Sequence, residues 1–313
     1  MIIRDRPSGL KLFLVLRGSI LPRILPTLTV NIIIATLVTF SHGDLFELKI
    51  TLTTIPFTLI GLPIAIFLGF RNNAAYDRFW EGRKLWGELV LRCRNFSRQC
   101  QSLIDYPEPA VASSGLTDIR VRMIYRAIVF AHTLRDLLRN KETAAELQYL
   151  LLEPEWLQLE KSPNKPDFLM QRMGMDLRLC IKEDRIDACL ATAIDATLSS
   201  MTAASASCER IKNTPIPFSY TLLLHRTAYI YCFLLPFGLV DSIGFMTPFV
   251  VAIVAYTFFG LDALGDEIEE PFGLESNDLP LDAICRAIEI DLRASLHDGN
   301  VPLPLAPVNY CLT

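Results

Sequence analysis

Residues 56–80 read PFTLIGLPIAIFLGFRNNAAYDRFW, an apolar run that ends abruptly in a polar and charged segment. No charged residue occurs from position 50 to position 70, and a helix of about 20 apolar residues can cross a membrane. The run also contains Pro56 and Pro63, and proline removes a backbone hydrogen bond from a helix interior. In lipid such a break is tolerated where protein or water satisfies the freed carbonyl group. The stretch therefore predicts a membrane helix that contacts protein or water on one side.

The composition of the whole chain also favours a membrane protein. Of its 313 residues 51% are hydrophobic, which is high for a soluble protein of this length. The formal net charge is −4, so no general surface for polyanions is indicated, and nucleic acid is not expected as a partner. The eight cysteines include no Cys-x-x-Cys pair, and we expect them to be reduced core residues.

Four segments come close to the length and apolarity of a membrane span. They are residues 24–40, 50–70, 218–240 and 242–260. The first and third contain polar residues, and polar groups inside a membrane helix usually face a protein neighbour or water. An oligomer or a water-filled path is therefore expected, with the lipid bilayer as surroundings.

The spans divide the chain into four expected parts. Residues 1–70 hold an N-terminal segment and two membrane helices, 71–217 a helical region, 218–261 two further membrane helices, and 262–313 an acidic segment, a helix and an extended tail. Apolar residues recur at helical spacing in the 71–217 region, and no run alternates as a strand would. The fold class predicted is therefore all-α.

Basic residues set the expected orientation in the membrane. The loop between the first two spans holds only Lys49, whereas basic residues gather before the first span and after the second: Arg4, Arg6, Lys11, Arg17, Arg23, Arg71, Arg78, Arg83 and Lys84. Positive charges mark the cytoplasmic side of a membrane protein. We therefore expect a multi-pass membrane protein with both termini and the 71–217 region in the cytoplasm.

The motifs of common enzymes are absent from the sequence. The four histidines show no H-E-x-x-H or paired-ligand spacing, and no P-loop, G-x-G-x-x-G or G-x-S-x-G occurs. A membrane enzyme is therefore not expected. Eight carboxylates lie within residues 262–282, but they lack the order of an EF-hand loop. They form either a solvated face or a site for a divalent cation.

Three apolar side chains in the opening stretch share one helical face. Leu62, Ile66 and Phe70 are spaced by four residues, so the stripe extends for roughly 12 Å along a helix. Contact with lipid or another helix is the ordinary explanation of such a stripe. Rings of apolar side chains around a symmetry axis would instead form a constriction that gates by excluding water.

Three motifs of this chain resemble signatures of the bestrophin channels. They are LPIAIFLGF at residues 62–70 with RFW at 78–80, NTPIPFSY at 213–220, and GLDALGDEIEEPFGLESNDLPLD at 260–282. The first is similar to the neck and following helix of that family, and the other two to signatures of its bacterial branch. The motifs occur in the family's order, and the resemblance covers most of the chain.

The resemblance implies a homopentameric ion channel with four transmembrane helices in each subunit and a cytoplasmic helical vestibule on the fivefold axis. Leu62, Ile66 and Phe70 would then form the rings of a hydrophobic neck. Pro63 would shape the neck between its first two rings, and Pro56 would bend the chain toward the outer entrance. The change in polarity at Arg71 would mark the opening into the water-filled vestibule.

The resemblance also implies a second constriction at the cytoplasmic exit. It falls near CIKEDRID at residues 180–187, where Ile181 and Ile186 are the two candidates. The aspartate run that helps to hold calcium in animal members is reduced here to LESND. Calcium dependence is therefore not expected to be retained in full, and no cofactor is expected to be required. Glu267, Glu270, Glu275 and Asp278 occupy positions comparable to the acids of the calcium site in animal members, and they are the candidates for a weak calcium site here.

Ion selectivity is the part of the function with the most alternatives. Animal bestrophins conduct anions, whereas the bacterial branch is associated with monovalent cations. The acidic net charge also favours cations, to which Asp184, Asp187 and Asp195 would contribute if they face the axis. We therefore expect passive conduction of sodium-like cations. The alternatives are a chloride or anion channel and, in a different class, a membrane-anchored scaffold without transport.

Overall fold

The computed structural model describes residues 1–3, 9, 15–16, 18–42, 44–45, 48–49 and 53–313. The chain forms two compact units. Unit 1 comprises residues 1–3, 81–214 and 272–313, and unit 2 comprises residues 4–80 and 215–271. The divisions at 80/81, 214/215 and 271/272 thus differ by three to ten residues from the 70/71, 217/218 and 261/262 boundaries expected from hydropathy.

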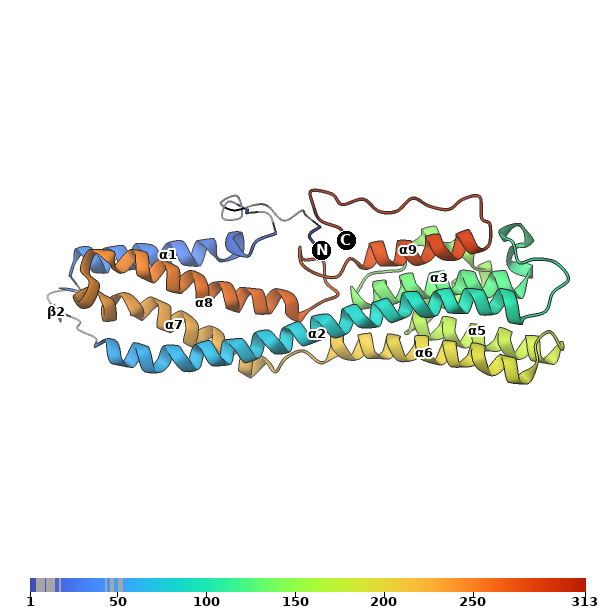
Figure 1. Cartoon of the computed structure of the whole chain (residues 1–313), viewed down its shortest axis with the longest axis horizontal. Helices are drawn as coiled ribbons and strands as arrows, with labels where there is room; N and C mark the ends of the chain where they lie inside the picture. Colours follow the sequence, from blue (N-terminus) through green and yellow to red (C-terminus); the bar gives the residue numbers. More distant parts are fainter. Residues whose placement is uncertain (4–8, 10–14, 17, 43, 46–47, 50–52) are drawn as a thin grey trace. The chain divides into compact units, whose positions relative to one another are not determined.

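Unit 2 consists of long apolar helices that lie side by side (Figure 1). Helix α1 spans Leu21–Phe40, α7 spans Phe218–Ile243 and α8 spans Thr247–Glu269, with the short 3₁₀ turn η4 (Gly244–Met246) between the last two. Helix α2 spans Thr54–Leu103, and its residues up to 80 belong to this unit. In the described ranges the only strands are β1 (Asp44–Leu45) and β2 (Leu48–Lys49), which pair antiparallel.

Three helical stretches are long and apolar enough to cross a membrane. They are Leu21–Phe40, Thr54–Leu103 and Phe218–Glu269, the last of which contains both α7 and α8. Residues 50–52 of the expected second span lie outside the described ranges. Helix α2 begins at Thr54 and continues beyond Phe70 to Leu103.

The two prolines of the opening stretch have different positions in α2. Pro56 lies in the first turn of the helix, where a backbone N–H needs no intrahelical partner. Pro56 therefore fits the helix start without breaking a hydrogen bond, and the bend toward the outer entrance stays a prediction. Pro63 lies inside the helix, as expected.

Helix α2 packs closely on α7 through one face. Phe57 packs with Leu235 and Val251 in one apolar cluster, while Ile64 and Leu68 pack with other residues of α7 in another. A side chain at position 238 would overlap the ring of Phe57, so Gly238 allows the two helices to approach. The buried face of α2 is thus fixed against its own bundle.

A proline in α7 is compensated by a side chain from α1. Pro236 lies inside α7 and has no N–H to donate to the carbonyl of Cys232, four residues earlier. The Asn31 side chain, which is fully buried, donates from Nδ2 to that carbonyl at 2.9 Å. Asn31 therefore supplies the hydrogen bond that Pro236 removes, as the polar residues in this span led us to expect.

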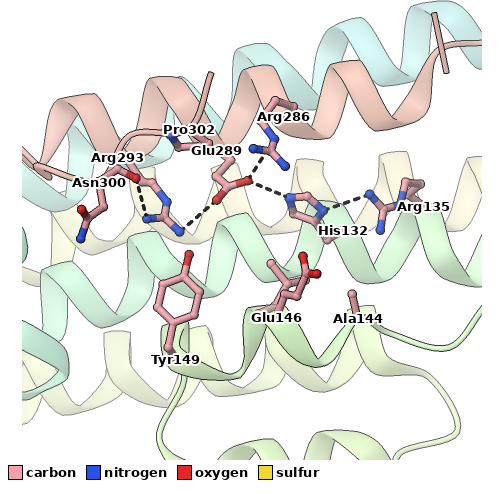
Figure 2. A pocket seen from close by; sticks show the side chains of 11 residues that line it. His132, Arg135, Ala144, Glu146, Tyr149, Arg286, Glu289, Arg293, Asn300 and Pro302 are labelled. Carbon is pink, nitrogen blue, oxygen red and sulfur yellow. Dashed lines mark hydrogen bonds and ion pairs between the residues drawn. The ribbon is translucent and has the colours of Figure 1, made fainter. Parts of the chain in front are cut away.

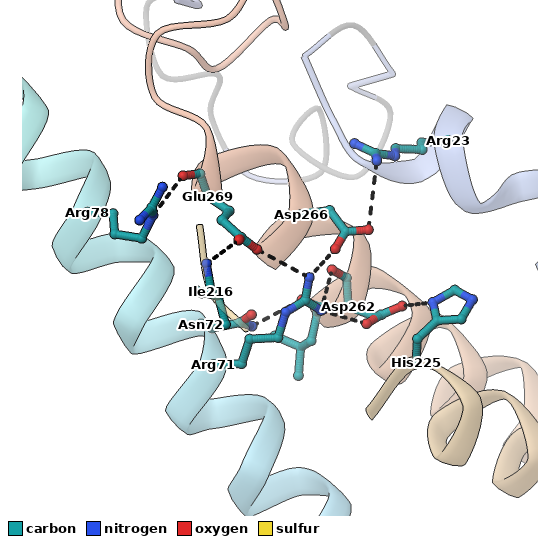
Figure 3. A network of polar contacts seen from close by, with 10 residues as sticks. Arg23, Arg71, Asn72, Arg78, Ile216, His225, Asp262, Asp266 and Glu269 are labelled. Carbon is teal, nitrogen blue, oxygen red and sulfur yellow. Dashed lines mark hydrogen bonds and ion pairs between the residues drawn. The ribbon is translucent and has the colours of Figure 1, made fainter. Parts of the chain in front are cut away.

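A buried arginine connects α2 to α8 at the end of unit 2 (Figure 3). Arg71 is fully buried, and its Nη1 lies 2.7 Å from Oδ1 of Asp262, while Nη2 pairs with Asp266 and lies 4.0 Å from Glu269. The second oxygen of Asp262 lies 2.7 Å from Nδ1 of His225 on α7. The charge of Arg71 is therefore neutralised inside the bundle, and the opening of a vestibule at this level of the helix stays a prediction.

Unit 1 is built around helix α3. Nearly every residue of α3 (Ile119–Leu138) is buried, because residues 81–103 of α2 and other elements surround it. These other elements are η2 (Ala112–Thr117), η3 (Ala145–Leu150), α4 (Glu153–Lys161), α5 (Lys165–Lys182), α6 (Ala188–Asn213) and α9 (Leu281–Ser295). The helical reading of this region is confirmed.

The tail after α9 is extended, as its prolines predict. Residues 301–307 have no regular structure, and Cys311 bridges to Ile2 of the N-terminal segment. All eight cysteines are free thiols, and six of them are buried. Burial raises the pKa of Cys208 to about 12, so this thiol stays protonated near neutral pH.

Replacing Arg71 by methionine is predicted to destabilise the protein strongly. The substitution leaves the buried Asp262 carboxylate without its cation, and breaking a buried ion pair in this way costs about 3–5 kcal/mol. The midpoint of thermal unfolding in detergent should fall clearly below that of the wild type. The control is Arg210→Met, because Arg210 and its partner Glu81 are largely exposed and such pairs contribute little. Equal midpoints for the two variants would contradict the assignment.

Candidate pore-lining site

The predicted neck residues form an exposed stripe on α2. Leu62, Ile66 and Phe70 are 65%, 47% and 60% exposed, whereas Ile64 and Leu68 on the other side of the helix are 3% and 0% exposed. Residues advance by about 100° each around a helix, so the stripe drifts by only about 40° per step. The structure therefore brings the three side chains onto one face that points away from the subunit's own bundle.

The same face continues beyond the predicted stripe in both directions. Ile55 and Leu59 precede it and are each 69% exposed. Asn73 and Asp77 follow it on the same face and are exposed as well. The sequence analysis did not single out Asn73 and Asp77, although their spacing from Phe70 by three and seven residues repeats the helical period. Along this face an apolar section thus gives way to an amide and a carboxylate.

Pro63 frees a carbonyl group on this surface. The carbonyl of Leu59, four residues earlier, loses its partner because proline has no N–H. In the described part of the chain no side chain donates a hydrogen bond to it, in contrast to the Asn31 contact that serves Pro236. An unsatisfied carbonyl in hydrocarbon costs several kcal/mol, so this surface calls for water or for a second protein chain.

The structure distinguishes the two candidates for the cytoplasmic constriction. Ile181, at the end of α5, is 40% exposed, whereas Ile186 is 6% exposed and belongs to the core of unit 1. A buried side chain cannot line a passage, so only Ile181 keeps the proposed role. Three acidic side chains expected near the axis, Asp184, Asp187 and Asp195, are all exposed. Asp187 also caps α6 by accepting a hydrogen bond from the backbone N–H of Cys189.

The four carboxylates predicted for a calcium site are divided between the two units. Glu267 and Glu270 belong to unit 2, whereas Glu275 and Asp278 belong to unit 1. Within the described ranges no group of three or more metal-type side chains is arranged to hold an ion. The carboxylate of Asp278 instead accepts a hydrogen bond from the backbone N–H of Glu275 at 2.7 Å, which stabilises a turn. Other acids of the same segment neutralise Arg71.

Comparisons with known proteins show the family of this chain. The sequence profile of the family described as "Bacterial/Fungal Bestrophin protein" matches residues 1–294. A voltage-dependent anion channel-forming protein of Mesorhizobium japonicum is 42% identical over 311 residues, covering 98% of this chain and 95% of the relative. The voltage-dependent anion channel-forming protein YneE of Escherichia coli K12 is 41% identical over 309 residues, covering 98% of each chain.

A solved structure shows the same fold. The crystal structure of a bacterial bestrophin homologue from Klebsiella pneumoniae superposes with a TM-score of 0.80 at 34% identity, covering 88% of this chain and 98% of that one. The family profile, the relatives and the structure extend over nearly the whole chain and agree with the three sequence motifs. This chain therefore belongs to the bacterial and fungal bestrophin family.

Proposed function

We propose that this protein is an ion channel in which several copies of the chain place the exposed face of α2 around a shared pore. The observation that carries the proposal is the stripe of Leu62, Ile66 and Phe70, which is exposed although it lies opposite the packed face of the same helix. The names of the curated relatives, which describe channel-forming proteins, support the same function.

The exposed face requires more than one copy of the chain to form a passage. One helix cannot enclose a path, and the stripe points away from the helices of its own bundle. A homopentamer with four transmembrane helices per subunit is the assembly implied by the family. In it Leu62, Ile66 and Phe70 form rings, and water in the pore satisfies the carbonyl freed by Pro63. Ile181 forms the second constriction.

The proposed location is a bacterial inner membrane, with both termini in the cytoplasm. The support is the distribution of basic residues, of which Arg4, Arg6, Lys11 and Arg17 lie outside the described residues. The extensive apolar surface of α1, α7 and α8 fits contact with lipid and with neighbouring subunits. No chemistry in the chain points to an enzyme, so permeant ions are the proposed substrates.

The two ion classes have different support. The relatives at 42% and 41% identity carry names that describe anion channels, which favours the anion alternative over the sodium-like cations expected from the sequence. The net charge of −4 and the exposed Asp77 below the neck favour cations. The names of the relatives therefore favour the anion alternative. The neck itself carries no charge that selects either class.

Alanine substitution of the neck residues is predicted to raise ion flux. Smaller side chains at positions 62, 66 and 70 widen an apolar constriction and lower its barrier to water, so flux into liposomes should rise severalfold in the triple variant. Ile253→Ala is the matched control, because Ile253 on α8 is 53% exposed and lies outside the proposed pore. Wild-type flux equal to that of empty vesicles would support the scaffold alternative. An unchanged flux in the triple variant would reject the neck assignment.

Replacing Asp77 by asparagine is predicted to shift ion selectivity toward anions. Removal of the carboxylate lowers the local concentration of cations at the mouth of the neck, whichever ion class the wild type prefers. Reversal potentials of the wild type and the variant in asymmetric NaCl measure this shift. The wild-type value decides between the anion and cation alternatives. A variant whose reversal potential equals the wild-type value would place Asp77 away from the conduction path.

A further inference from the structure

Unit 1 contains a polar pocket that the channel proposal does not use. It has a volume of about 470 Å³ and lies among α3, η3, α9 and the segment after α9 (Figure 2). Its wall carries His132 and Arg135 from α3 and Arg286, Glu289 and Arg293 from α9. All of these residues belong to one unit, so the pocket is complete within a single chain.

The tautomer of His132 follows from its neighbour. Nη1 of Arg135 lies 3.2 Å from Nδ1 of His132, and a guanidinium can only donate, so Nδ1 accepts. The ring hydrogen of a neutral His132 is then on Nε2. This atom is buried and has no hydrogen-bond partner in the described part of the chain, because the nearest carboxylate oxygen, of Glu289, is 3.5 Å away. His132 thus presents an unused donor, although its side chain is only 7% exposed.

Two arginines of α9 add further unused donors. The Nε atoms of Arg286 and Arg293 are buried and have no hydrogen-bond partner among the described residues. Arg293 uses its other nitrogens, with Nη2 at 2.9 Å from Glu289 and Nη1 at 3.2 Å from Asp298. The Nε of Arg286 lies 3.6 Å from Glu289, which is longer than a hydrogen bond. The carboxylate of Glu289 is therefore shared by the guanidinium groups of Arg286 and Arg293 and the imidazole of His132.

Three buried donors without acceptors in one pocket are unusual. More than about 90% of buried polar groups in proteins have a partner, because leaving one unpaired costs free energy. Oxygens of a carboxylate or phosphate group accept hydrogen bonds from arginine and histidine with favourable charge. Three arginine side chains line the pocket, so an oxyanion is the ligand chemistry that its wall favours, and Glu289 neutralises part of this positive charge while no ligand is bound.

We propose that this pocket binds a small organic molecule that carries one oxyanion group, either a carboxylate or a phosphate. The volume is far larger than the roughly 30 Å³ of a water molecule, so it holds an organic body beside the charged group. Leu147, Tyr149 and Pro302 line other parts of the pocket and provide contact for that body. Glu146, which is exposed, disfavours polyanions by charge repulsion. This binding function is independent of ion conduction.

Isothermal titration calorimetry of the purified full chain in detergent tests the proposal. The probes are glycerol 3-phosphate and butanoate, each with one oxyanion group, and sodium chloride at matched ionic strength is the reference. We expect saturable binding of at least one probe with a Kd of about 1 mM or tighter. A preference between the probes identifies the group as phosphate or carboxylate. Absence of saturable heat with both probes up to about 10 mM would mean that water fills the pocket, and would overturn the proposal.

Two variants and one control locate the binding. Arg286→Gln should weaken binding by about tenfold, since a charged donor is lost. Arg92→Gln is the control, because Arg92 is 34% exposed against 32% for Arg286 and also pairs with a glutamate on its own helix. Glu289→Gln should tighten binding, because the acceptor that competes for the donors loses its charge. Equal weakening in the Arg286 and Arg92 variants, or weaker binding in Glu289→Gln, would reject this pocket as the site.

Discussion

The burial of the Arg71 guanidinium constrains everything else in unit 2. Removing such a charge from water costs several kcal/mol unless acidic groups surround it, and here Asp262, Asp266 and Glu269 of α8 do so. A side chain at Gly265 would collide with Asn72, so the two helices can meet only at this rotation. Once Arg71 faces α8, the helical period directs Leu62 and Ile66 away from α8 and Phe70 to the side, and all three are exposed. The ion pair therefore decides which residues are available to a pore.

The helical architecture could be predicted from the sequence because apolar spacing is a local property. The same local reasoning found the stripe on α2 and the family motifs. It failed where the environment of a residue depends on distant parts of the chain. The burial of Arg71 was not predicted, because its partners lie about 190 residues away in sequence. The acids near position 262 were considered for calcium, although some of them are the partners of that arginine.

The two candidates for the cytoplasmic constriction show the same limit in another form. Ile181 and Ile186 are equally apolar and only five residues apart, so composition cannot separate them. The structure separates them because the chain turns after α5 and directs Ile186 into the core. Conversely, Asn73 and Asp77 continue the exposed face of α2, but they are polar and therefore do not belong to a pattern of apolar rings. Sequence periodicity shows which residues share a helix face, but it does not show whether that face is exposed.

The contact between Asn31 and the carbonyl of Cys232 has a consequence for engineering the protein. Common strategies for stabilising membrane proteins replace polar residues in spans by leucine or other apolar residues. At position 31 that change would raise the hydropathy of α1 and yet leave a main-chain oxygen of α7 without a donor in a dry bundle. The better route is to change Pro236 together with Asn31, since a residue with its own N–H would restore the helical hydrogen bond. Asn31 and Pro236 should therefore be changed together, because a change of Asn31 alone leaves the carbonyl of Cys232 without a donor.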